Sequence, residues 1–95
     1  MVIGVLKARL TLRQSRSLKD KRRIVNSLKD RLRNSFNVSV AEVDGQDVVQ
    51  SATLAVVQVS VDARYVRSSL DCALKVIGRC REAQLADHRI ELLSP

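Results

Sequence analysis

Alternating apolar and polar positions characterise the start of the chain. In residues 2–12 every even position is apolar or glycine, whereas Lys7, Arg9 and Thr11 occupy odd positions. This period of two predicts a strand whose even-numbered face packs against helices. Gly4 and Ala8 are small, which is the expected choice where a helix crosses that face closely.

The period changes to that of a helix in residues 15–36. Ser17, with Asp20 three residues later, forms a capping-box-like start, and we expect the helix to continue to about Asn34. Apolar residues recur there at steps of three and four, which places them in one stripe that must be buried. The stripe consists of Leu18, Val25, Leu28, Leu32 and Phe36, with Ile24 on its flank.

Three more strands and a second helix complete the pattern. We expect strands at 38–43 and 53–61 and a short one at 89–93, with a helix at about 63–82 capped by Asp62. The polar loop 44–47 contains Asp44-Gly45, a pair that favours positive φ. The order βαββαβ predicts one α+β domain over residues 1–95, a ferredoxin-like sandwich. Both helices would cover one face of a four-stranded antiparallel sheet in the strand order 4-1-3-2.

The sheet face away from the helices is then open, and we place an apolar cluster on it beside polar side chains. Such a cluster is typical of a homodimer or protein-partner interface, although scattered exposed apolar residues are also common. The apolar members are Ile3, Val5, Leu54 and Val56, and the polar ones are Lys7, Arg9, Gln58 and Ser60.

Positive charge is concentrated in the first part of the sequence. The formal net charge is +7, and residues 1–36 hold 11 Lys/Arg against 2 Asp/Glu, whereas residues 37–95 hold 6 against 8. This asymmetry favours a polyanionic partner such as RNA, and the alternative is a basic helix that is only solvated. The candidates for phosphate contacts are Arg13, Arg16, Lys19, Arg22, Arg23, Lys29 and Arg33.

Other classes of function lack their signals. No stretch has the length and hydropathy of a membrane span or a secretory signal, which predicts a cytoplasmic protein without membrane contact. The single histidine, His88, has no catalytic or metal-ligating companions at the usual spacings, and no glycine-rich phosphate loop is present. We therefore predict neither enzymatic activity nor a metal, cofactor or small-molecule substrate. Base stacking on the sheet is also excluded, because strands 2–12 and 53–61 contain no aromatic residue.

Three stretches of the sequence carry a family resemblance: MVIGVLKARL, SRSLKDKRRIVNSLKDRLRNSFNVSVAEVDGQD and ATLAVVQVS. Through them the chain resembles the YlxP-like family of small bacterial proteins of unknown function. The resemblance implies a ferredoxin-like fold, a cytoplasmic location and a connection with RNA or a ribosomal subunit, because members are often encoded beside translation and ribosome-maturation factors. It supplies no catalytic residues. The favoured hypothesis is an RNA- or ribosome-associated protein, and the alternative is a homodimeric or protein-partner module.

Overall fold

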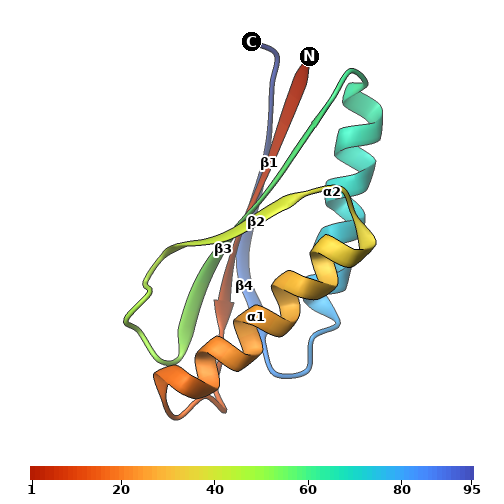
Figure 1. The fold of residues 1–95 in the computed structure, drawn as a ribbon. Helices are drawn as coiled ribbons and strands as arrows, with labels where there is room; N and C mark the ends of the chain where they lie inside the picture. Colours follow the sequence, from red (N-terminus) through yellow and green to blue (C-terminus); the bar gives the residue numbers. More distant parts are fainter.

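A computed structural model describes residues 1–95 and contains two helices packed on one face of a four-stranded sheet (Figure 1). The elements are β1 (Val2–Thr11), α1 (Leu18–Ser35), β2 (Ser39–Asp44), β3 (Ser51–Ser60), α2 (Ala63–Gly78) and β4 (Gln84–Leu93). All strand pairs are antiparallel, and the order across the sheet is β2-β3-β1-β4. This confirms the predicted ferredoxin-like arrangement and its strand order.

The core lies between the sheet and the two helices. The even-numbered side chains of β1 face it, as the alternation predicted, and the apolar stripe of α1 covers part of the same face. The largest fully buried apolar side chains are Leu6, Leu10, Leu12, Leu28, Leu32, Leu54, Leu70 and Ile77. Burial of each such side chain stabilises the fold by about 1.5–3 kcal/mol, so this layer of leucines and isoleucine supplies most of the driving force. Neither helix combines the length and apolarity needed to cross a bilayer.

Gly4 marks the point where α2 approaches β1 most closely. A Cβ atom at this position would lie 2.7 Å from Leu70 Cδ1 and would overlap Val66 Cγ1. Both neighbours belong to α2 and are fully buried. The prediction of a close helix crossing at Gly4 is therefore confirmed.

The second half of the chain differs from the expected boundaries. Helix α2 ends at Gly78, before the expected end near residue 82, because the chain turns there: Arg79 N donates to Lys75 O and Cys80 N donates to Ile77 O, each at 3.1 Å. Strand β4 spans 10 residues and is longer than expected. It is an edge strand with most side chains exposed, so it lacks the apolar alternation by which strands are recognised.

The assignment of Leu54 and Val56 to the open face is wrong. In the β1–β3 register Leu54 pairs with Ala8 and Val56 pairs with Leu6, so both point toward the helices and have no exposed area. The placement of Gln58 and Ser60 on the open face is wrong for the same reason, because they pair with Gly4 and Val2 and share the helix-facing side. Both faces of β3 are apolar in sequence, so alternation alone did not distinguish them. Ile3 and Val5 do lie on the open face, where they pair with Val59 and Val57.

Candidate nucleic-acid interface

Side-chain hydrogen bonds cap the N-terminus of α1. Ser17 Oγ accepts a hydrogen bond from Asp20 N at 3.0 Å, and Asp20 Oδ2 accepts one from Arg16 N at 3.1 Å. This reciprocal capping places a carboxylate where the helix dipole favours an anion. The Asp20 carboxylate therefore already occupies the position at the start of α1 that an external anion would take.

Lys21 is a structural residue. Its side chain is 2% exposed, and its ammonium group donates to the carbonyl oxygens of Gly45 and Val48, each at 2.7 Å, and of Gln46 at 3.3 Å. Its Nζ atom also lies 2.7 Å from Glu42 Oε2. Gly45 has φ of 70°, as the Asp-Gly pair predicted, and the loop so formed turns three carbonyls toward one cation. Lys21 therefore ties α1 to the β2–β3 loop and is not available to a ligand.

Two of the residues predicted to contact phosphate bind other groups of this chain. Arg23 forms a bidentate pair with Glu82, with distances of 2.7 Å and 3.2 Å. The hydrogen bond from Arg23 lowers the pKa of Glu82, and the same hydrogen bond raises the pKa of Arg23. Arg33 Nη2 donates to Val40 O at 3.0 Å, while its Nη1 lies 3.9 Å from an Asp30 oxygen. Arg23 therefore neutralises the carboxylate nearest to it, and Arg33 connects α1 to β2.

The other predicted cations have no ion-pair partner. Arg13 and Arg16 lie in the β1–α1 connection, Lys19 and Arg22 are exposed on α1, and Lys29 is half-buried on the same helix. All five are exposed or half-buried, and none of them takes part in a salt bridge within the chain.

The structure adds three arginines that the sequence did not assign to this surface. Arg31 of α1 lines a pocket of about 280 Å³ with Arg79 and Arg81 from the α2–β4 connection. Arg81 and Glu82 also line a second pocket, of about 150 Å³, which contains Arg13. In Figure 1 this connection passes beside the middle of α1. We use the name basic surface for the cations without an ion-pair partner on α1 and on the two connections next to it, β1–α1 and α2–β4: Arg13, Arg16, Lys19, Arg22, Lys29, Arg31, Arg79 and Arg81.

Sequence reasoning missed Arg79 and Arg81 because it extended α2 over them. The shorter helix places both in a turn that folds toward α1. The usable signal was Gly78, a residue enriched where helices end.

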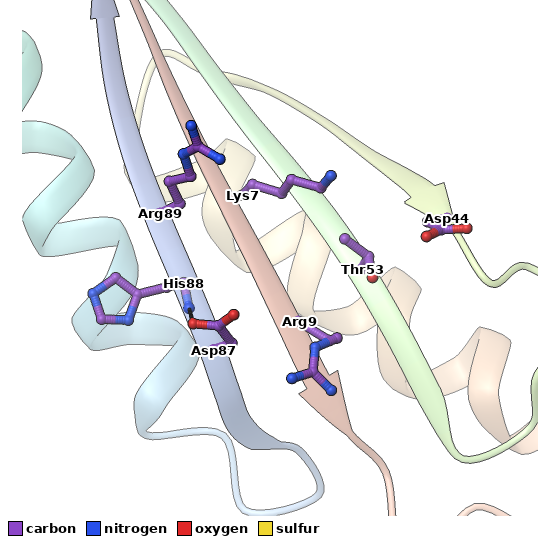
Figure 2. Close-up of a pocket in the computed structure, with 7 residues that line it drawn as sticks. All are labelled: Lys7, Arg9, Asp44, Thr53, Asp87, His88 and Arg89. Atoms are coloured by element: carbon purple, nitrogen blue, oxygen red, sulfur yellow. Dashed lines mark hydrogen bonds between the residues drawn. The ribbon is translucent and has the colours of Figure 1, made fainter.

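The open sheet face has two unlike ends. Ile3, Val5 and Val57 form an apolar end with the more exposed Val59 and Leu93. The other end is polar and contains a pocket lined by no hydrophobic residue (Figure 2). Its residues are Lys7, Arg9, Asp44, Thr53, Asp87, His88 and Arg89.

Comparison with known families decides the classification. A family model described as "Protein of unknown function (DUF503)" matches residues 3–90. The chain belongs to this family. It is also 28% identical over 90 residues to the "Uncharacterized protein YlxP" of Bacillus subtilis (strain 168), with 95% of this chain and 98% of that protein covered. The YlxP-like resemblance is therefore confirmed, and with it a family whose function is not known.

Solved structures support the fold alone. The designed protein Foldit4 matches with a TM-score of 0.58 and 10% identity, over 100% of this chain and 99% of that one. A de novo designed protein with ferredoxin fold, LFR1 1, matches with a TM-score of 0.56 and 11% identity, over 98% and 84% of the two chains. At such identities the shared feature is the ferredoxin-like architecture, and function has to be argued from surface chemistry.

Proposed function

We propose that this protein binds RNA through its basic surface, as a non-enzymatic, ribosome-associated accessory protein of the cytoplasm. The observation that carries the proposal is the set of unpaired cations along α1 and the α2–β4 connection, where the carboxylate Glu82 is already neutralised by Arg23. Cations without intramolecular partners are free to neutralise phosphates and to release condensed counterions.

The expected mode is recognition of backbone and shape. Arginine side chains form bidentate hydrogen bonds with phosphate oxygens, and Arg31, Arg79 and Arg81 converge on one pocket. Neither pocket on this side contains an aromatic side chain on which a base could stack. Binding should therefore depend strongly on salt and weakly on base sequence.

The test is binding of fluorescently labelled ribosomal RNA fragments across a salt series, together with co-sedimentation with ribosomal subunits. The variant Arg31→Gln/Arg81→Gln should weaken RNA binding and reduce the slope of log K against log salt by about 0.7–0.9 for each phosphate that is no longer neutralised. The control Arg64→Gln/Lys75→Gln changes net charge equally at exposed positions of α2 outside both pockets. If both variants behave alike, binding reflects net charge and the basic surface is not an interface. Failure of the native protein to bind RNA at low salt would exclude the proposal altogether.

A second candidate function rests on the apolar end of the open sheet face. Val59 is 59% exposed and Leu93 is 48% exposed, and Ile3, Val5 and Val57 lie beside them. A second copy packed on this end would bury these side chains in a two-fold dimer. If the native protein dimerises, Val59→Asp should yield a folded monomer in light scattering. A native protein that stays monomeric at high concentration would exclude this function.

A further inference from the structure

The polar end of the open sheet holds three cations on two neighbouring strands. Lys7 and Arg9 follow one another on the open face of β1, and Arg89 of β4 lies directly opposite Lys7 in the strand register. Neither Lys7 nor Arg9 forms a salt bridge, and Arg89 uses its Nε atom for Glu91, at 2.8 Å. Like charges directly opposite one another destabilise a sheet, and only Arg89 of this pair has a carboxylate partner, so an anion bound between Lys7 and Arg89 would relieve their repulsion.

Side chains of the sheet beside these cations can accept hydrogen bonds from the hydroxyl groups of a ligand. Asp44, Thr53, Arg9 and Asp87 lie in one register row that crosses all four strands. Thr53 is 8% exposed and occupies the centre of this row, while the two carboxylates stand at its ends. Each carboxylate accepts one backbone N–H, from Gly45 at 2.8 Å and from His88 at 2.9 Å. The second oxygen of each remains available.

Figure 2 shows how the side chains lie. Lys7 extends across β3, Asp87 stands between β4 and β1, and His88 is turned toward α2, away from the others. The cavity volume is about 260 Å³, below the 300–1,000 Å³ typical of sites for drug-sized ligands. No hydrophobic residue lines it, so no surface is offered to a nucleobase or an acyl chain.

From this geometry we infer that the polar end of the open sheet is a binding site for a small phosphorylated sugar or polyol. Lys7, Arg9 and Arg89 bind the phosphate, and Thr53 with one or both aspartates accepts hydrogen bonds from the neighbouring hydroxyl groups. A bare anion would be repelled by Asp44 and Asp87, whereas a ligand with one phosphate and several hydroxyls satisfies both kinds of group. The site lies on the sheet face opposite the helices, so it is separate from the basic surface.

The test is calorimetric titration of the full chain with ribose 5-phosphate, inorganic phosphate, ribose and phosphoethanolamine, with amide chemical shifts used to locate the ligand. Ribose 5-phosphate should bind at least tenfold more tightly than the other three and should shift amides of β1, β3 and β4. Lys7→Gln/Arg9→Gln should weaken its binding at least tenfold. The control Lys19→Gln/Arg22→Gln, which removes two charges from the basic surface, should bind it as the native protein does.

Lys7→Gln adds a second readout, the thermal stability with and without ligand. Removing one of two opposed cations should raise the melting temperature of the ligand-free protein and diminish the further rise on adding ribose 5-phosphate. The inference is overturned if ribose 5-phosphate does not bind, or if the basic-surface control loses binding equally. Equal binding of inorganic phosphate would overturn the role of the hydroxyl acceptors, and tighter binding of phosphoethanolamine would show that the aspartates accept an ammonium group instead. RNA binding through α1 would be untouched by any of these results.

Discussion

Replacing Lys21 by methionine tests whether a buried ammonium group holds the β2–β3 loop in place. Methionine retains the length and apolar stem of the side chain, so the change removes the charge and its hydrogen bonds with little loss of packing. In the native structure this group contacts three loop carbonyls and the Glu42 carboxylate. The variant leaves the three carbonyls without their common donor and the Glu42 carboxylate without its counter-ion.

The expected loss of unfolding free energy depends on how deeply Lys21 and Glu42 are buried. Breaking a buried ion pair by removing one member costs about 3–5 kcal/mol. Here Glu42 is 19% exposed and the loop carbonyls belong to half-buried or exposed residues, so water can solvate some of these acceptors in the variant. We therefore expect a loss near the lower end, about 3 kcal/mol, out of a total stability of about 5–15 kcal/mol for a domain of this kind.

Urea denaturation followed by circular dichroism measures the loss of unfolding free energy. The control is Lys29→Met, at a half-buried position on the same helix. Its unfolding free energy should stay within about 0.5 kcal/mol of the native value. Lys21→Met/Glu42→Gln should be more stable than the sum of the single variants predicts, by about 0.5–3 kcal/mol, because the two residues interact. Amide exchange in residues 45–48 should accelerate in the single variant. A change in unfolding free energy below about 1 kcal/mol for Lys21→Met would refute the reasoning, since it would mean that water already solvates the ammonium group.

Two further predictions concern Gly4 and the Arg23–Glu82 pair. Gly4→Ala should destabilise the fold by about 1–3 kcal/mol in urea denaturation because its methyl group would overlap side chains of α2, whereas Gly78→Ala, with no neighbour within 4 Å, should be neutral or slightly stabilising; equal effects would contradict the close crossing. Arg23→Gln should raise the pKa of Glu82 toward its ordinary value of 4.5, measured by carboxyl NMR titration. Because the folded-state pKa is lowered, the pair stabilises the protein above the unfolded pKa, and this contribution is lost as pH falls through the folded value. An unchanged Glu82 titration in Arg23→Gln would show that the pair does not persist in solution.

The fold could be predicted because its elements have periods that differ clearly. In residues 2–12 all even positions are apolar or glycine while Lys7, Arg9 and Thr11 stand at odd positions, and α1 carries one narrow apolar stripe, so the type and buried face of each element follow from the sequence. Strand β3 is different: Leu54 and Val56 face the helices and Ala55 and Val57 face away, but all four are apolar. Its register with β1 decides the face, and register is a tertiary property.

Lys21 shows how a signal can be present and still be overlooked. It follows Leu18 by three residues and precedes Val25 by four, so it lies within the apolar stripe of α1. A lysine in such a position either extends its charge to solvent or meets buried acceptors. Only the folded chain shows which, because Glu42 and the loop carbonyls lie more than twenty residues away in sequence.

The distribution of charge along the chain and its distribution in space are therefore different quantities. All of the net positive charge comes from the first 36 residues, yet Lys21 is buried beside Glu42, Arg23 pairs with Glu82 and Arg33 donates to a backbone carbonyl. The second part of the chain is net acidic, yet it contributes Arg79 and Arg81 to the same side of the molecule. Contacts within the fold thus occupy some of the cations predicted for the interface, while the fold brings other cations next to α1. Mutations chosen from charge counts alone would combine structural residues with free ones, whereas Arg31→Gln/Arg81→Gln changes only cations that have no ion pair within the fold.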